Sequence, residues 1–148
     1  MEPARPTRSR EHRLVLVCAL ALPMALFALG RFLTPDPRGW GTHEQLGFRP
    51  CLPMRLWNFP CPGCGVTTSI ALVAHGRPLA ALRTQPFGLV VLASGFLAAA
   101  WALRGHLSGR DLHAELARLS WRRVGSCLAT LALLAWIYKL AVVRHGNG

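Results

Sequence analysis

Two cysteines separated by a proline and a glycine are the residues of this sequence best suited to chemistry. Cys61 and Cys64 lie in the stretch NFPCPGCGVTTSIALVAHG, residues 58–76, and Gly65 follows them directly. A Cys-Pro-Gly-Cys tetrapeptide predicts a β-turn, in which proline presets φ at the second position and Gly63 supplies the positive φ of a type II turn at the third. The Cα atoms that close such a turn lie within about 7 Å, which suits a disulfide and equally two thiolates on one metal ion.

A metal site is one chemistry that this turn allows. A Cys-Pro-x-Cys-Gly sequence forms one half of many zinc sites, and zinc normally takes four ligands. The chain has no second C-x-x-C pair, so the other ligands would be single residues. Cys51 and His43 are the candidates, which gives a Cys₃His set of Cys51, Cys61, Cys64 and His43. The cofactor stays open at this point, with zinc as one candidate.

Sulfur chemistry without a metal is the alternative. Cys61 and Cys64 could be the working pair of a thiol-disulfide oxidoreductase, because Cys64 comes just before a predicted helix start, where a thiol has a lowered pKa. A purely structural disulfide, between these two or from Cys51 to one of them, is a further alternative. Cys18 and Cys127 lie inside apolar runs and are expected to be packing residues.

The composition is that of a membrane protein. Of the 148 residues, 52% are hydrophobic and only 16% are charged, while the formal net charge is +11. Such a charge could indicate nucleic-acid binding, but the arginines lie between long uncharged runs and are not interleaved with aromatic residues, as a single-strand binding groove would need. We therefore expect a lipid bilayer, and no nucleic acid, as a partner.

Three apolar runs are long enough to cross a bilayer, since a helix rising 1.5 Å per residue needs about 20 residues for a hydrocarbon core of about 30 Å. They are residues 14–33, 87–103 and 124–143. The first follows a basic head like a signal peptide, but its length and its poor small-residue site favour an uncleaved anchor. Lys139, near the end of the third run, is expected to snorkel to the headgroups. The sequence therefore predicts an all-α membrane protein with three transmembrane helices.

The arginines predict its orientation. Four lie in residues 1–13 and five in residues 104–123, and three spans put both segments on one side, which the positive-inside rule makes the cytoplasmic side. Residues 34–86, which carry the cysteines, then face outward as one loop, and residues 144–148 form a short tail. We expect a multi-pass protein with a cytoplasmic N-terminus.

The outward loop has two parts. Its first half is rich in proline and glycine and predicts ordered loop and turns rather than helix. Residues 66–75 are apolar but too short to span, so we expect a short interfacial or re-entrant helix after the Cys-Pro-Gly-Cys turn. Thr67 is expected to cap its start and Gly76 its end, and Pro86 to open the second span. The predicted turn and cap residues are Pro62, Gly63, Gly65, Thr67, Gly76 and Pro86.

The block PCPGCGVTTSIALVAHGRPLAALRTQPFGLVVL, residues 60–92, resembles the signature of domain-of-unknown-function family 2752, a family of bacterial membrane proteins. There a C-P-x-C-G-x-T core precedes a small-residue helix, an H-G turn and an N/Q-P step into a transmembrane helix. The upstream DPRGWGTHEQLGFRPC, residues 36–51, is similar to a subgroup of the family. Many relatives carry T-R-A where this chain has Thr67-Thr68-Ser69, so a role of that arginine does not carry over. The resemblance implies a small integral protein of the bacterial inner membrane, and no activity.

Together these features predict a non-enzymatic membrane protein. Its Cys-Pro-Gly-Cys turn would organise the outward segment, by a disulfide or a metal, and present it to another membrane protein. Small residues at 93–95 and 125–126 favour close helix contacts and hence a homo- or hetero-oligomer. The alternative function is a membrane thiol-disulfide oxidoreductase using Cys61 and Cys64.

Overall fold

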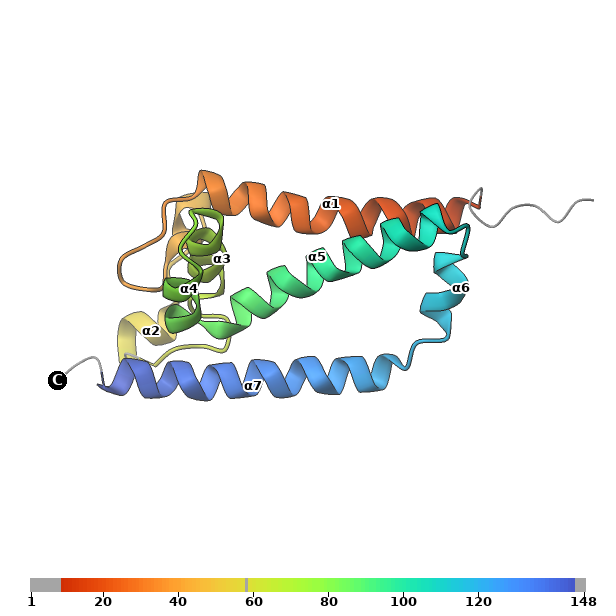
Figure 1. Cartoon of the computed structure of the whole chain (residues 1–148). Helices are drawn as coiled ribbons and strands as arrows, with labels where there is room; N and C mark the ends of the chain where they lie inside the picture. Colours follow the sequence, from red (N-terminus) through yellow and green to blue (C-terminus); the bar gives the residue numbers. More distant parts are fainter. Residues whose placement is uncertain (1–8, 58, 146–148) are drawn as a thin grey trace, which may run out of the picture.

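The computed structural model describes residues 9–57 and 59–145, and all regular structure in this part of the chain is helical (Figure 1). The predicted all-α fold class is confirmed. Residues 1–8 of the predicted basic tail and residues 146–148 of the predicted C-terminal tail lie outside the described residues. The elements, in chain order, are α1 (Arg10–Phe32), the 3₁₀ helix η2 (Thr42–Leu46), α2 (Leu52–Trp57), α3 (Val66–Ala74), α4 (Pro78–Thr84), α5 (Pro86–Leu107), α6 (Leu112–Ala117) and α7 (Trp121–His145).

Three of these helices, α1, α5 and α7, are long and apolar enough to cross a membrane, as predicted. Many of their leucines point outward: Leu22 is 63% exposed, Leu97 72% and Leu134 57%. Exposing this much apolar surface to water is unfavourable in free energy, whereas contact with lipid tails carries no such cost. The chain is therefore a multi-pass membrane protein.

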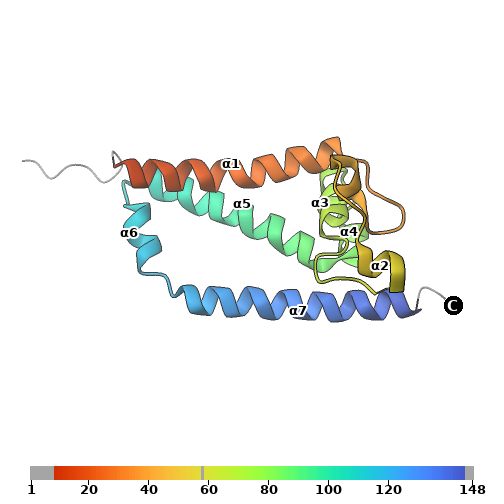
Figure 2. The same cartoon turned by 180° about the vertical axis from the view of Figure 1, so that it is seen from behind.

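α1 and α5 run antiparallel and pack against each other (Figures 1 and 2). Gly95 permits a close approach, because a Cβ added there would lie 3.0 Å from the Cβ of Pro23 in α1. Next to it, the rings of Phe27 and Phe96 meet edge to face with centroids 6.1 Å apart. Gly95 is one of the small residues predicted to serve helix contacts, and here it serves a contact within the chain.

α6 joins α5 to α7 at the end of the molecule where α1 begins (Figure 1). The Asp111 carboxylate caps α6 by accepting hydrogen bonds from the backbone N–H groups of His113 and Ala114. Fully buried His12 of α1 accepts a hydrogen bond at Nδ1 from the Leu112 N–H (3.3 Å), and its Nε2 lies 3.0 Å from Nδ1 of His106. These bonds hold the start of α1, the end of α5 and the start of α6 together.

The opposite end of the molecule holds the segment between α1 and α5, in which α3 and α4 pack together (Figure 2). α3 contacts both long helices through glycines. A Cβ on Gly30 of α1 would lie 3.1 Å from the Ile70 side chain, and a Cβ on Gly88 of α5 would lie 2.7 Å from the Cβ of Ser69. Because these glycines carry no side chain, α3 lies directly against both backbones, as the small residues of membrane helices allow.

The end of α3 is a Schellman motif. Gly76 has φ of +72° and donates a hydrogen bond to the Val73 carbonyl, while the Arg77 N–H donates to the Leu72 carbonyl. Gly76 therefore ends the helix as the left-handed residue after its C-cap. Pro86 is the first residue of α5, where its missing N–H has no helical partner to lose.

The prediction of no helix in the first half of the outward segment is wrong for two short elements. η2 forms because Gly41 and Gly47, with φ of +90° and +82°, flank it and let the chain turn sharply at both ends. α2 forms after Cys51, whose carbonyl accepts the Arg55 N–H, and Pro53 lies in its first turn, where proline is tolerated. α2 fixes the position of Cys51 beside the Cys-Pro-Gly-Cys turn.

Candidate metal centre

Three cysteine sulfurs lie together where α2 and α3 begin. Sγ of Cys64 is 3.2 Å from Sγ of Cys61 and 3.1 Å from Sγ of Cys51, and all three sulfurs lie within 4.8 Å of one another. All three are free thiols, and Cys64 is buried. The structure thus brings three of the four predicted metal ligands into one cluster, which we call the three-thiol cluster.

The turn between Cys61 and Cys64 closes as predicted but with a different conformation. The Cys64 N–H donates to the Cys61 carbonyl at 3.0 Å. Gly63, however, is not among the described glycines with positive φ, so the predicted type II geometry is wrong. The left-handed residue is Gly65, with φ of +90°. Pro62 supplies the fixed φ, and the chain reverses at Gly65 before entering α3.

Besides allowing the positive φ, glycine at position 65 leaves room for neighbouring atoms. A Cβ on this residue would lie only 2.8 Å from the Gly39 carbonyl oxygen and 3.4 Å from Nζ of Lys139. Gly65 is also the N-cap of α3, and no side chain makes a capping hydrogen bond there. The prediction that Thr67 caps this helix is therefore wrong, because the left-handed backbone of Gly65 takes the cap position.

The pKa values of Cys51 and Cys64 are shifted in opposite directions. Burial, and then the hydrogen bonds to its two sulfur neighbours, raise the pKa of Cys64 well above its ordinary value. Burial would also raise the pKa of Cys51, but hydrogen bonds from the Cys64 thiol and from the Met54 N–H at the start of α2 outweigh it and lower that pKa. Cys51 is thus the thiol of this pair that ionises more readily, and Cys64 is the thiol that stays protonated.

Lys139 is the functional residue that sequence reasoning placed wrongly. It does not snorkel to headgroups: only 3% of it is exposed, and its ammonium donates to the carbonyls of Gly39 and Thr84 at 3.1 Å each. It also interacts electrostatically with Cys64. Among the described residues no carboxylate pairs with it. It is the only lysine beside sixteen arginines, a signal that could have marked it.

Two further side chains of α7 attach this helix to the cysteine segment. The Trp136 indole N–H donates to the Pro60 carbonyl at 2.8 Å, directly before Cys61, and its ring meets Phe59 edge to face. The Tyr138 hydroxyl donates to the Arg83 carbonyl at 3.0 Å. α7 is therefore held to the cysteine segment by donors that bind backbone carbonyls of the loops and of the end of α4, with Lys139 as the charged donor.

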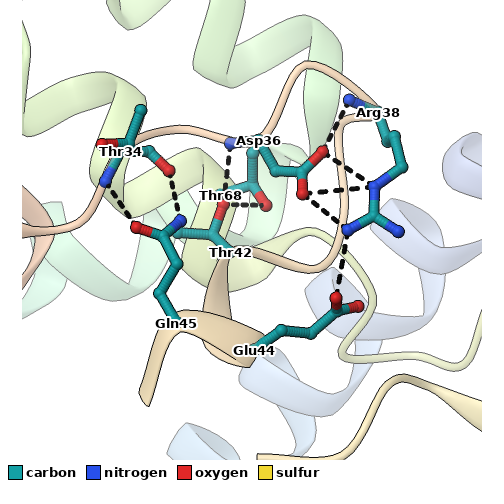
Figure 3. Close-up of polar contacts among 7 residues, drawn as sticks. All are labelled: Thr34, Asp36, Arg38, Thr42, Glu44, Gln45 and Thr68. Carbon is teal, nitrogen blue, oxygen red and sulfur yellow. Dashed lines mark hydrogen bonds and ion pairs between the residues drawn. The ribbon is translucent and has the colours of Figure 1, made fainter. Parts of the chain in front are cut away.

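The loop upstream of Cys51 is ordered by its own polar side chains (Figure 3). The buried hydroxyls of Thr42 and Thr68 are 2.8 Å apart, and Thr42 also accepts the Asp36 N–H. Gln45 pairs twice with the backbone of Thr34, accepting its N–H at 3.0 Å and donating to its carbonyl at 2.7 Å. The hydrogen bond between Thr42 and Thr68 thus attaches this loop to α3, the helix that follows the cysteines.

Ion pairs between charged side chains also order this loop (Figure 3). The Arg38 guanidinium binds the Asp36 carboxylate at 2.7 Å and the Glu44 carboxylate at 3.1 Å, and it lies over the Trp40 ring at 4.3 Å. The hydrogen bond from Arg38 lowers the pKa of Asp36. Both acids are therefore committed to Arg38 and are not partners of Lys139.

The predicted fourth ligand, His43, is not in the three-thiol cluster, and neither are His75 and the two cysteines expected to be packing residues. His43 is not part of the group of sulfur ligands, although it lies in η2 beside Thr42. His75 binds the Ala71 carbonyl at 2.9 Å through Nδ1 and faces Arg31 at 3.5 Å, so it serves the end of α3. Cys18 and Cys127 are exposed on α1 and α7, where a bilayer would surround them.

Gln85, which precedes α5, completes the surroundings of the turn. It is fully buried, and its amide nitrogen is 3.4 Å from the Pro62 carbonyl. Its Oε1 has no hydrogen-bond partner among the described residues. A buried acceptor without a partner is costly, and this one belongs to a side chain that contacts the Cys-Pro-Gly-Cys turn.

Residues 51–101 of the chain match the model of a family described as a protein of unknown function (DUF2752). The match includes the three cysteines, α3, α4 and most of α5, and it supports membership of that family. Neither a curated protein nor a solved structure matches the chain.

Proposed function

We propose that the three-thiol cluster of this chain, whose residues 51–101 match the model of the DUF2752 family, binds one soft metal ion, for which Zn²⁺ is the best fit. The observation that supports this proposal is the approach of Cys51, Cys61 and Cys64 to 3.1–3.2 Å, as free thiols, beside a buried ammonium group. In this reading the chain is a membrane protein with a structural metal site and no catalytic activity.

The spacing of the sulfurs supports a metal. Zn–S bonds of about 2.3 Å at tetrahedral angles separate two sulfurs by about 3.8 Å. The two short sulfur separations, 3.2 Å and 3.1 Å, need to open by only about 0.6–0.7 Å to reach that value, a change within the reach of side-chain rotation. Soft thiolate ligands select zinc, copper(I) or iron–sulfur clusters over magnesium or calcium. Three sulfurs leave one tetrahedral position for a water molecule or for an outside ligand.

Charge balance favours a divalent ion. Three thiolates around Zn²⁺ carry a net charge of −1, and a buried charge needs a partner of opposite sign. Lys139 supplies it: the ammonium interacts with Cys64 and uses two of its three N–H donors on the carbonyls of Gly39 and Thr84. A monovalent ion such as copper(I) would leave a second negative charge without a partner.

A bound metal would organise the whole outward segment. It would tie Cys51 before α2 to the turn before α3, while Lys139 brings α7 to the same point. Such a segment presents an apolar surface, since Leu52, Leu56 and Trp57 of α2 are 60%, 63% and 73% exposed. This surface supports the proposal that α2 lies in the interface of the bilayer or contacts another membrane protein or a second copy of the chain.

The orientation is proposed from the arginines. Residues 9–13 and 104–123 lie at one end of the molecule (Figure 1) and carry seven arginines. The positive-inside rule then makes this end cytoplasmic, and the cluster faces outward from a bacterial inner membrane, with residues 14–33, 87–103 and 124–143 as the spans.

The alternative function is thiol-disulfide exchange, favoured by one observation. Cys51, whose pKa is lowered, touches Cys64 at 3.1 Å, so its thiolate is placed to attack a disulfide between Cys61 and Cys64. This reading requires the pair to be oxidised in the purified protein.

Zinc analysis and alkylation distinguish the two functions. Protein extracted from membranes is alkylated after denaturation, with and without reduction, and its intact mass and metal content are measured. The metal site predicts about one zinc per chain and labelling of all five cysteines without reduction. Labelling that rises by two only after reduction, in protein without metal, would overturn it in favour of the disulfide.

A matched pair of variants assigns the metal to the cluster. Cys64→Ser is expected to lose the zinc, whereas Cys127→Ser, on the exposed side of α7, is expected to keep it. If Cys64→Ser fails to fold, Co²⁺ bound to the unchanged protein reports the same ligands through its sulfur-to-cobalt charge-transfer absorption. Equal zinc in the two serine variants, or cobalt without that absorption, would rule out the site.

A further inference from the structure

A cleft of about 810 Å³ lies far from the cysteines, at the arginine-bearing end of the molecule. α1 contributes Leu14, Cys18 and Leu22 to its wall, and α5 contributes Leu97, Ala98 and Trp101. Residues of α6 and the first residue of α7, Trp121, line the end of the cleft nearest the start of α1. The size is that of a ligand site of about 300–1,000 Å³, and the metal centre does not use it.

The cleft has the length of one bilayer leaflet. From Leu14 to Leu22, eight residues along α1 rise by about 12 Å, and half of a hydrocarbon core of about 30 Å is about 15 Å. The wall is apolar apart from Glu115, whose carboxylate is already bound by Arg110 at 3.0 Å. An occupant within this length must therefore be a flexible hydrocarbon rather than a polar metabolite.

Exposed arginines lie next to lining residues in the sequence at the end of the cleft formed by α6 and the start of α7, which we take as its mouth. Arg118 is exposed and lies in the sequence between the lining residues Leu116 and Leu119, and exposed Arg122 follows Trp121 directly. Exposed Arg13 precedes Leu14. In residues 9–13 and 104–123, seven arginines face three acidic residues, and of those three Asp111 caps α6 and Glu115 pairs with Arg110. The rim therefore has cations without carboxylate partners above an apolar slot.

We propose that this cleft binds one anionic phospholipid. An acyl chain fills the slot between α1 and α5, and the arginines at the mouth bind the phosphate and the second charge of the headgroup, as basic pockets between membrane helices do. Trp101 and Trp121 lie at the level of the headgroup, where indole rings are favoured. The charge at the mouth selects an anionic lipid over a zwitterionic one with the same chains.

Native mass spectrometry of the full chain tests the proposal. The protein is transferred into detergent with equal amounts of palmitoyl-oleoyl phosphatidylglycerol and phosphatidylcholine, and the retained lipid is counted. We expect one phosphatidylglycerol per chain. Ala98→Trp, which fills the cleft, should lower that occupancy about tenfold or more, whereas Ala100→Trp, an exposed position of α5 that does not line the cleft, should leave it unchanged.

A second pair of variants tests the headgroup without touching the slot. Arg118→Gln with Arg122→Gln should lower the preference for phosphatidylglycerol by about fivefold for each arginine removed. Arg77→Gln with Arg83→Gln makes the same change of charge at exposed positions of the other end and should not. Equal retention of the two lipids would overturn the proposal. So would a lipid-free dimer that Ala98→Trp dissociates, because the cleft would then bind a second copy.

Discussion

Nζ of Lys139 donates to the carbonyl oxygen of Gly39 at 3.1 Å, although the two residues are one hundred positions apart. The bond joins the third membrane helix to the loop that precedes the first cysteine. A second bond, to Thr84, joins the same ammonium to the start of the second span. Because the charge also faces Cys64, the affinity of the cluster for a metal and the docking of α7 depend on one side chain.

Replacing Lys139 by methionine should therefore weaken zinc binding. A complex with net charge −1 would lose its buried counter-charge, so we expect affinity to fall by about tenfold or more in a competition titration with a chromophoric chelator. Arg144→Met removes the same charge from an exposed position of α7 and is the control. Equal affinities of the two variants would show that Lys139 does not balance the site.

Alanine substitutions at two neighbouring glycines should have opposite results. Gly65→Ala forces a Cβ to 2.8 Å from the Gly39 carbonyl at a φ of +90°, so we expect a loss of about 2 kcal/mol or more in the free energy of unfolding and a loss of zinc. Gly63→Ala meets no atom within 4 Å and should change stability by less than about 0.5 kcal/mol. Thermal unfolding in detergent measures both, and a larger cost at Gly63 would contradict the observed turn.

Thr68→Val should loosen the loop upstream of the cysteines. It removes the buried hydroxyl that bonds Thr42 at 2.8 Å and leaves the buried Thr42 hydroxyl with the Asp36 N–H as its remaining partner, and the lost hydrogen bond costs about 1–3 kcal/mol. Thr67→Val, half-buried on the same helix and not the cap, should cost less than about 0.5 kcal/mol. Hydrogen exchange of residues 36–47 would report the loosening, and equal protection in the two variants would show that Thr68 does not fasten the loop.

The metal-free protein should lose stability at alkaline pH. Burial raises the pKa of Cys64 above its ordinary value of 9.0, so the folded state holds a proton that the unfolded state releases. The stabilisation is complete below about pH 9 and is lost as pH rises above that value. With zinc bound the thiols are already deprotonated, and the unfolding temperature should not follow this slope. The lowered pKa of Cys51 acts in the opposite sense below about pH 9, so a metal-free protein whose unfolding temperature does not fall as pH rises above 9 would contradict this account of Cys64.

The predictable part of this molecule follows from local chemistry. Uninterrupted apolar runs are enough to identify α1, α5 and α7, and Gly76 and Pro86 end and start their helices because backbone freedom and a missing N–H act over a few residues. The proximity of Cys61 and Cys64 follows in the same way from a four-residue turn.

The rest depends on contacts that no local pattern contains. Gly63 and Gly65 are both glycines near one turn, and the local sequence does not indicate that Gly65 takes the positive φ and lies against the carbonyl of Gly39. Thr67 has the chemistry of a cap, but the backbone reverses two residues earlier. Lys139 is buried instead of snorkelling because a loop residue, Gly39, and the last residue of α4, Thr84, each more than fifty residues away in sequence, present carbonyls to it.

X-ray absorption at the zinc edge of the purified, detergent-extracted protein tests the central claim most directly. The account predicts three sulfur neighbours at about 2.3 Å and one lighter neighbour at about 2.0–2.1 Å, with the sulfur signal lost in Cys51→Ser and unchanged in Cys18→Ser. A zinc shell of nitrogen and oxygen alone, or a protein that binds no zinc at micromolar metal while its Cys61 and Cys64 are oxidised, would contradict it.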